Sequence, residues 1–227
     1  MASSRSPREL ATPGRAPVPW IVPWTGEPLV LGEIVATHRG IAYVDELPAD
    51  RGRHGELLRR GTRPVADADR GRPLLGKINH ARQRRSMRRL LCQVCGLPAD
   101  RTDAGTLWVL DSLTYRQVRA RDFGGVRQLP VCLPCAWLSV RACPILGRGY
   151  VAVRVSAVRL VGVYGVLCAP APLPHHPGEI RVVAECHTAL YDDPALPWVL
   201  ASETQVALCG VTIVDLEAEG GAGSCPR

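Results

Sequence analysis

The chain has 227 residues, of which 46% are hydrophobic and 22% charged, which is typical of one ordinary globular domain or two small ones. This composition excludes a wholly disordered protein. The longest uncharged stretch near the apolar centre, 160–174, has 15 residues and contains Gly and Pro, whereas a membrane helix needs about 20 apolar residues. The first 20 residues lack the apolar block of a secretory signal. We therefore expect a cytoplasmic protein that does not associate with a membrane.

The formal net charge of +7 is concentrated in one segment of the chain. Residues 51–90 contain 12 arginines and one lysine against three acidic residues, which gives +10, so that the remainder sums to −3. A concentrated cationic segment can neutralise phosphates and release counterions, which makes binding to nucleic acid sensitive to salt. A solvated surface or a flexible basic linker explains the same composition, and the sequence leaves both interpretations open.

The N-terminal third of the chain predicts little regular structure apart from one hairpin. Residues 1–27 are rich in Pro, Ser and Arg and are expected to form a flexible arm whose last part docks on the protein. Two apolar, β-branched runs around a short glycine-containing turn predict a β-hairpin over 28–47. Residues 48–78 show little periodicity and predict a basic linker, with one helical turn over 56–60.

The middle of the chain, 79–146, begins with a predicted basic helix. Residues 79–91 contain no Gly or Pro and place apolar side chains on one face and arginines on another, a pattern typical of an amphipathic helix. Further along, 106–110 predicts a strand, and 126–131 is a candidate partner for it. The residues after Cys135 predict a second helix, which ends at a proline.

The C-terminal third, 147–217, is expected to be rich in β-strands, and 218–227 is expected to be a tail. The predicted strands cover 150–167, 180–184, 198–201 and 204–216. Several strands together with a few short helices indicate an α+β fold.

Four of the nine cysteines form two Cys-x-x-Cys pairs, and the other five stand alone. The pairs are Cys92 with Cys95 and Cys132 with Cys135. A gap of two residues lets a tight turn aim both thiolates at one ion, and four thiolates are a common ligand set of structural zinc. Gly96 allows the backbone to curl around the first pair, and the second pair precedes a helix whose N-terminal amides face the thiolates. We therefore predict one structural zinc ion bound by these four cysteines.

Redox-active or merely buried cysteine pairs are the alternative interpretation. A thioredoxin-like site needs only one such pair, at the start of a helix, so the other pair would be superfluous. Cys143 lies eight residues beyond Cys135, or about 12 Å along a helix, which is too far for the same ion unless the helix breaks early. An odd number of cysteines in an expected reducing compartment argues against a disulfide framework.

The order of knuckle, hairpin and helix-capping pair over 91–143 resembles the treble-clef and zinc-ribbon modules. The run 84–100, the motif Gly-Thr-Leu-Trp at 105–108 and the second cysteine pair together resemble a family of uncharacterised proteins from GC-rich bacteria, over about 79–216. The resemblance implies a zinc-stabilised, treble-clef-like module packed with additional β-strands. It implies no activity.

Treble-clef modules include the HNH nucleases, so an enzyme has to be considered. Their chemistry needs a histidine base and a second metal site on the hairpin and helix of the module. Residues 96–131 contain no histidine, and the helix after Cys135 contains none either. A divergent metal-dependent nuclease built from distant residues such as His80 and His187 therefore ranks below a binding protein, and whether the chain is an enzyme stays open.

The leading hypothesis is a zinc-containing binding protein that contacts nucleic acid through its arginines. The candidate nucleic-acid-binding residues are Arg82, Arg84, Arg85, Arg88 and Arg89. Aromatic residues are few and do not alternate with the arginines, which favours contact with the phosphates of a duplex or of structured RNA over stacking on single strands. A protein-interaction adaptor is the alternative, because the apolar C-terminal third can form an interface.

Overall fold

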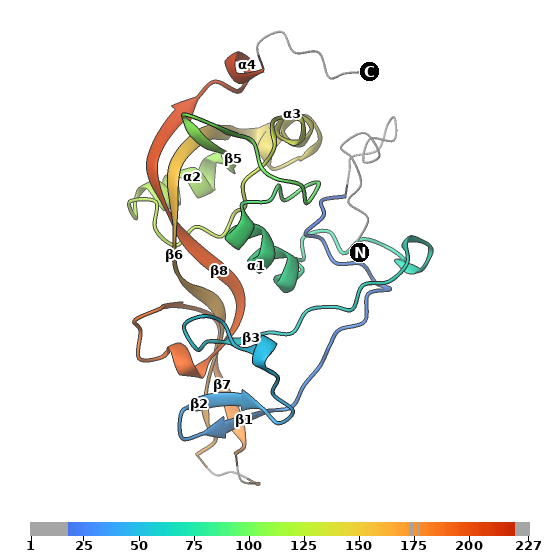
Figure 1. The fold of residues 1–227 in the computed structure, drawn as a ribbon, viewed down its shortest axis with the longest axis vertical. Coiled ribbons are helices and arrows are strands. Elements are labelled where there is room, and N and C mark those ends of the chain that lie inside the picture. Colours follow the sequence, from blue (N-terminus) through green and yellow to red (C-terminus); the bar gives the residue numbers. More distant parts are fainter. Residues whose placement is uncertain (1–17, 173–174, 177, 221–227) are drawn as a thin grey trace.

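The computed structural model describes residues 18–172, 175–176 and 178–220, and over these residues the protein has a mixed α+β fold (Figure 1). A six-stranded sheet has the order β3-β8-β6-β5-β4, with β7 also paired to β6. Its strands are β3 (Leu57–Leu58), β4 (Arg101–Thr102), β5 (Gly105–Asp111), β6 (Tyr150–Pro170), β7 (Ile180–Leu190) and β8 (Val199–Val214). A separate antiparallel hairpin consists of β1 (Ile34–Thr37) and β2 (Gly40–Tyr43).

Two long strands, β6 and β8, form an antiparallel ribbon that connects the two ends of the molecule (Figure 1). The first part of β6 pairs with β5, and its last part pairs with β7. The pairing of β6 with β8 shifts register near Gly162 and Gly165. A Cβ atom at Gly165 would lie 2.1 Å from the carbonyl oxygen of Leu200, so only glycine allows the strands to approach this closely.

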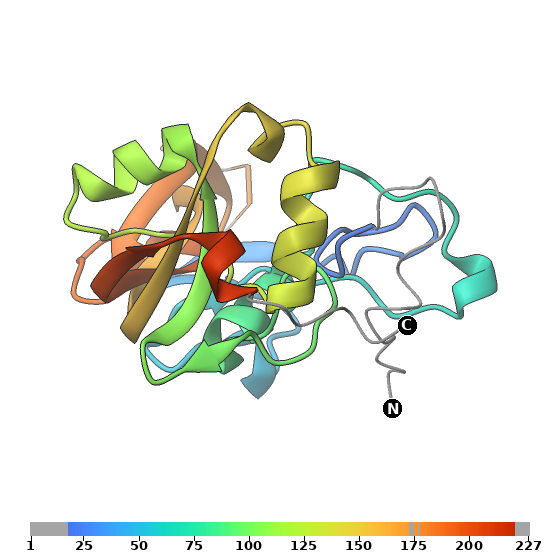
Figure 2. The same cartoon turned by 90° about the horizontal axis from the view of Figure 1, so that it is seen from above.

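At the upper end of Figure 1, β5 is buried on both faces. Its side chains alternate between two hydrophobic clusters: Trp108 and Leu110 face one, and Leu107 and Val109 face the other. The helices α2 (Ser112–Arg119) and α3 (Leu133–Ala142) lie on opposite sides of this strand (Figure 2).

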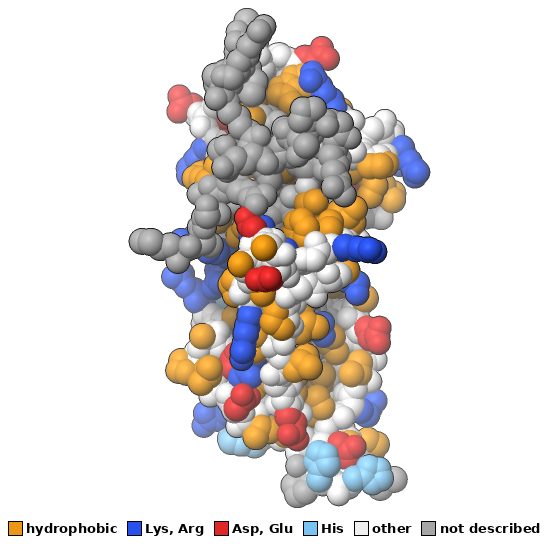
Figure 3. Space-filling view, turned by 90° about the vertical axis from the view of Figure 1, so that its right-hand side faces the viewer, with side chains coloured by type: hydrophobic (Ala, Val, Ile, Leu, Met, Phe, Trp, Pro, Cys, Tyr) orange, Lys and Arg blue, Asp and Glu red, His pale blue; other side chains and the backbone are white. Residues whose placement is uncertain are grey.

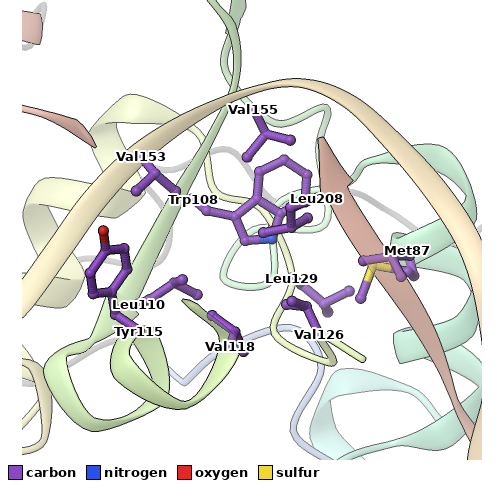
Figure 4. Packing of buried hydrophobic residues seen from close by; sticks show 11 residues of the cluster. Met87, Trp108, Leu110, Tyr115, Val118, Val126, Leu129, Val153, Val155 and Leu208 are labelled. Atoms are coloured by element: carbon purple, nitrogen blue, oxygen red, sulfur yellow. The ribbon is translucent and has the colours of Figure 1, made fainter. Parts of the chain in front are cut away.

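Trp108 occupies the centre of the first cluster (Figure 4). The same cluster contains Met87, Val118 and Leu208, so it joins two helices and two strands. The indole N–H donates to the carbonyl oxygen of Gln128 at 3.1 Å, which leaves no buried donor unsatisfied on this residue.

The lower end of the molecule is built around the hairpin and β3 (Figure 1). Ile41, Tyr43 and Leu57 pack there with residues of β6 and β8 in a further cluster. The helical turn expected over 56–60 is wrong, because Leu57 and Leu58 are buried as a short strand parallel to β8. Two three-residue 3₁₀ turns, η1 (Pro48–Asp50) and η2 (Asp67–Asp69), lie in the same stretch of chain. Only part of the expected linker over 48–78 packs against the sheet: Leu57 and Leu58 are buried beside β8, whereas η2 contains no buried residue.

The structure differs from the sequence expectations at three further places. Residues 126–131 are not a partner strand for β5: Val126 forms an isolated bridge with β8, and β4 and β6 flank β5 instead. The helix α2 was not expected. The two strands expected over 198–216 form one continuous β8, preceded by the 3₁₀ turn η4 (Leu196–Trp198).

The short helix α4 (Leu216–Glu219) follows β8, and η3 (Leu146–Arg148) precedes β6. The regular structure thus continues slightly into the expected tail, of which 221–227 lies outside the described residues, as does 1–17 of the expected arm. Among the described residues, no helix is both long and apolar enough to cross a membrane.

Candidate metal centre and basic helix

The first cysteine pair lies directly after the helix α1 (His80–Arg89). Asn79 caps the start of this helix, accepting a hydrogen bond from the backbone N–H of Arg82. At its end Leu90 adopts a left-handed conformation, with φ of 51°, and the backbone N–H of Leu91 donates to the carbonyl oxygen of Ser86. This helix ending turns the chain directly into Cys92.

The residues around Cys92 and Cys95 form a tight knuckle. The N–H of Cys92 donates to the carbonyl oxygen of Leu97 at 2.7 Å, and the N–H of Gly96 donates back to the carbonyl oxygen of Cys92 at 2.9 Å. Gly96 has φ of +73°, a conformation that favours glycine, as the sequence pattern indicated. The knuckle therefore directs both sulfurs to the same side of the turn.

The second pair begins α3. Cys132 is the N-cap residue of this helix and Cys135 lies in its first turn. A backbone hydrogen bond from Gln93 to the carbonyl oxygen of Pro130, at 3.1 Å, holds the segment before the helix against the knuckle. The two pairs, separated by 36 residues in the sequence, are thereby brought together.

The four sulfur atoms of Cys92, Cys95, Cys132 and Cys135 all lie within 4.8 Å of one another. The sulfurs of Cys95 and Cys132 are 3.7 Å apart. Four sulfurs placed tetrahedrally at about 2.3 Å from a zinc ion are separated by about 3.8 Å. The cluster therefore has the donor atoms and the dimensions of a four-thiolate metal site.

The electrostatic interactions among the four thiols also favour a bound cation. Hydrogen bonds from the other cysteines, that of Cys132 first, hold the pKa of the Cys92 thiol far below its ordinary value. The pKa of the Cys135 thiol is raised, first by its hydrogen bond with Cys132. Thiols this close resist ionising together, and a divalent cation is what allows all four to become thiolates.

The cluster is largely buried: three of its cysteines are buried and Cys132 is half-buried. Cys92 and Cys135 have no exposed surface, and the N-terminal segment covers the knuckle from outside. The N–H of Trp20 donates to the carbonyl oxygen of Val94 at 2.8 Å, and its indole ring lies against Gly96, where a Cβ atom would be 2.8 Å from the ring. Gly96 is thus needed both for its backbone conformation and for the contact with Trp20.

Two cavities lie near β3 among the described residues, and none of the four cysteines lines either of them. His80 and His187 do not line these cavities either. Burial lowers the pKa of His80 to about 4, so its imidazole is neutral at physiological pH.

The remaining cysteines lie apart from the cluster. The eight described cysteines are all free thiols. Cys143 is the C-cap residue of α3, and the continuous helix places it away from the cluster, as its spacing predicted. Cys168 is buried among hydrophobic residues, Cys209 is half-buried and Cys186 is exposed, while Cys225 lies outside the described residues.

The five candidate arginines of α1 do not form one surface, because two of them are used inside the protein. Arg82 pairs with the buried carboxylate of Glu27 and donates to the carbonyl oxygens of Trp20 and Val22. It therefore fixes the N-terminal segment that covers the knuckle.

Arg84 and Gln83 cover an open edge of β8. The guanidinium of Arg84 donates to the carbonyl oxygens of Ala201 and Ser202, at 3.3 and 2.8 Å. The side-chain amide of Gln83 bonds both the N–H and the carbonyl oxygen of Thr204, at 2.9 and 3.0 Å. These polar side chains therefore satisfy backbone groups that a neighbouring strand would otherwise bind.

The other three arginines, Arg85, Arg88 and Arg89, are exposed on α1. Their spacing of three and four residues places them on one side of the helix, and within the described part of the chain none of them forms an ion pair. On the face shown in Figure 3, basic side chains are scattered among acidic and hydrophobic ones rather than gathered in a single patch. The regional charge of the sequence is therefore partly dispersed by the fold.

A buried ion-pair network at the C-terminal end of the fold was missed by the sequence analysis. Arg154 is 1% exposed and pairs with Asp100, at 2.6 Å, and with Glu219 of α4. Its position on the strand, inside a valine-rich run, marks it as an inward-facing charge, and that alternation is the only signal that could have found it.

Comparisons with known proteins leave the chain unassigned to a family. No family model matches it, and no curated protein or solved structure matches it significantly.

Proposed function

We propose that the four-cysteine cluster binds one zinc ion, which serves to hold a treble-clef-like module together. The support is the all-sulfur donor set, the 3.7 Å separation of two of its sulfurs and the burial of the cluster. The knuckle is followed by the β4–β5 hairpin and then by α3, which is the order of such a module, although α2 lies between hairpin and helix. The zinc would stabilise the fold without taking part in chemistry.

We further propose that the protein binds nucleic acid through Arg85, Arg88 and Arg89. The observation that carries this proposal is that these three guanidiniums are exposed, lie on one side of α1 and are not engaged by acidic residues of the described chain. Arg82 and Arg84 contribute by holding the helix in place. Binding of this kind contacts phosphates rather than bases, so we expect little preference for a particular nucleotide sequence.

The salt dependence of binding tests the proposal. Three phosphate contacts on duplex DNA predict a slope of log affinity against log salt of about −2.7. Replacing Arg85, Arg88 and Arg89 together with Gln should weaken binding and bring the slope close to zero. Fluorescence anisotropy with a labelled DNA duplex and a labelled RNA hairpin measures both quantities.

A matched control is available on α2 and the loop after it. Arg116, Arg119 and Arg121 are exposed as well, so replacing these three with Gln removes the same charge from another part of the surface. Equal losses in the two triple variants would refute the assignment to α1. Absence of binding at low salt, or binding that does not respond to salt, would refute the nucleic-acid proposal and favour a protein-interaction adaptor.

A further inference from the structure

A cavity of about 420 Å³ lies beside β3, away from the four cysteines. Its walls come from four parts of the chain: Val30, the loop and 3₁₀ turn over 45–50, the residues 58–63 at and after β3, and Arg84 of α1. Its volume falls within the range of about 300 to 1,000 Å³ that is usual for sites that bind small molecules.

The acidic residues in this cavity are already neutralised. Asp45 and Asp50 both bind Arg60, whose guanidinium donates to Asp50 at 3.0 and 2.7 Å and to Asp45 at 3.0 Å. The hydrogen bond from Arg60 holds the pKa of Asp50 below its ordinary value, so this carboxylate stays ionised and paired.

Three other arginines line the same cavity without an acidic partner. Over the described ranges of the chain, Arg59, Arg63 and Arg84 take part in no ion pair. With Arg60 and the two aspartates, the lining contains four arginines against two acids and therefore carries a net charge of +2. The cavity is cationic because three of its four arginines have no acidic partner among the described residues.

The burial of Arg84 makes this excess of positive charge unfavourable for the folded protein. Its residue surface is only 7% exposed, and its hydrogen bonds go to backbone carbonyl oxygens, including that of Arg59 at 2.7 Å. Burial, and then the charge of Arg88, lowers the pKa of Arg84 to about 10, so it remains protonated at neutral pH. The charge of Glu56 offsets this effect only in part, since the pKa of Arg84 stays lowered, and an anion in the adjoining cavity would reduce the remaining penalty.

We infer that this cavity binds a small organic phosphate monoester, with the phosphate held by Arg59 and Arg63 beside the buried positive charge of Arg84. A phosphate monoester carries a charge close to −2 at neutral pH, which matches the charge of the lining. Guanidinium groups bind phosphate oxygens through paired hydrogen bonds. Val30, Leu47 and Leu58 supply an apolar wall for the organic group, which inorganic phosphate would leave uncovered. The site is independent of the exposed arginines proposed to contact nucleic acid.

Calorimetric titration of the full chain with phenyl phosphate, and separately with inorganic phosphate, tests the inference. We expect saturable binding of both, with phenyl phosphate bound more tightly because its ring covers the apolar wall. Replacing Arg59 and Arg63 with Gln should weaken phenyl phosphate by about 100-fold, since each charged hydrogen bond contributes about ten-fold. Arg84 is left unchanged in this variant because it also holds β8.

Three variants show whether binding is specific to this cavity. Arg72→Gln removes an exposed charge of the same basic segment that does not line the cavity, and it should bind as the wild type does. Leu47→Ser should weaken phenyl phosphate while leaving inorganic phosphate unchanged. The nucleic-acid variant of Arg85, Arg88 and Arg89 should retain phenyl phosphate binding, so that the two proposals fail or succeed separately.

The inference is overturned if phenyl phosphate does not bind saturably, or if the Arg59→Gln, Arg63→Gln variant binds it as well as the wild type does. Equal affinity for phenyl phosphate and inorganic phosphate would overturn the assignment to an organic ester, because the apolar wall would then contribute nothing.

Discussion

The two ends of the β6–β8 ribbon are stabilised in different ways. At one end, the knuckle and α3 lie in a hydrophobic cluster that includes the candidate metal ligands Cys92, Cys95 and Cys135. At the other end, the β1–β2 hairpin and β3 pack through side chains such as Ile41 and Leu57, and Arg60 forms ion pairs with Asp45 and Asp50. If the proposed zinc is bound, the first end depends on a metal ion, whereas the second depends on ordinary burial of apolar surface.

This difference shows how the same sheet can be stabilised by a local motif and by contacts between distant segments. Two short Cys-x-x-Cys motifs specify the cysteine end, and they need only come close enough to bind the proposed ion together. The hairpin end needs several segments to assemble at once, and α1 lies between the ends with Met87 in one core and Gln83 on the edge of β8. The following predictions test whether the ends respond separately.

The largest effect is expected from the metal ligands. Replacing Cys92 with Ser removes one of the four thiolates, and structural zinc contributes of the order of 10 kcal/mol to the folding of small zinc domains. We expect a poorly soluble chain without bound zinc. Metal analysis and circular dichroism measure this, and the exposed Cys186→Ser is the matched control, which should keep both zinc and fold.

A smaller loss is expected from the buried ion-pair network at the cysteine end. Replacing Arg154 with Met leaves the carboxylates of Asp100 and Glu219 without their partner and should lower the free energy of unfolding by about 3 kcal/mol. Urea unfolding of the zinc-loaded protein measures the change. Arg159→Met, at an exposed position of the same strand, should change stability by less than about 0.5 kcal/mol; equal effects would contradict the role of the network.

The contact between α1 and the edge of β8 is expected to contribute less again. Gln83→Ala leaves the buried N–H and carbonyl oxygen of Thr204 unsatisfied, which should cost about 2 kcal/mol. Hydrogen exchange at Thr204 should become faster in this variant. Gln117→Ala on the exposed side of α2 serves as the control, and unchanged exchange in the Gln83 variant would show that the edge is covered by something else.

The smallest effect concerns a buried carboxyl group near the middle of the ribbon. Burial raises the pKa of Glu203, and Arg127, 3.6 Å away, compensates only partly. Stability therefore falls as the pH rises above the ordinary pKa of the group, about 4.3, towards its raised value in the folded protein. Glu203→Gln should stabilise the protein slightly at pH 7, and the gain should shrink near pH 4.

Urea unfolding at several pH values measures this effect. Glu33→Gln, at an exposed position of the hairpin end, should show no such pH-dependent gain. A Glu203→Gln variant that is less stable than the wild type at pH 7 would contradict the assigned direction.

The parts of the fold that could be predicted from the sequence are those with a local pattern. The cysteine pairs and the helix after Cys135 have characteristic spacing, and β6 has a valine-rich alternation that only a strand explains. The α+β class and the candidate metal centre follow from these patterns alone.

The rest depends on contacts between distant residues. The hydrogen bonds between Gln83 and Thr204 span 121 residues, so no local pattern shows that polar side chains of α1 face a sheet edge. The same holds for Leu57 and Leu58, whose strand conformation comes from pairing with β8. Residue composition groups Arg82 and Arg84 with the exposed arginines of α1, but specific carbonyl and carboxylate partners draw both into the protein.

The central claim is that four cysteines bind one zinc ion, and X-ray absorption at the zinc edge tests this claim directly. Measured on the purified full chain, together with the metal content, it should give one zinc ion per chain with four sulfur ligands at about 2.3 Å. A protein without zinc, or a zinc ion with nitrogen or oxygen among its ligands, would contradict the closed four-cysteine centre.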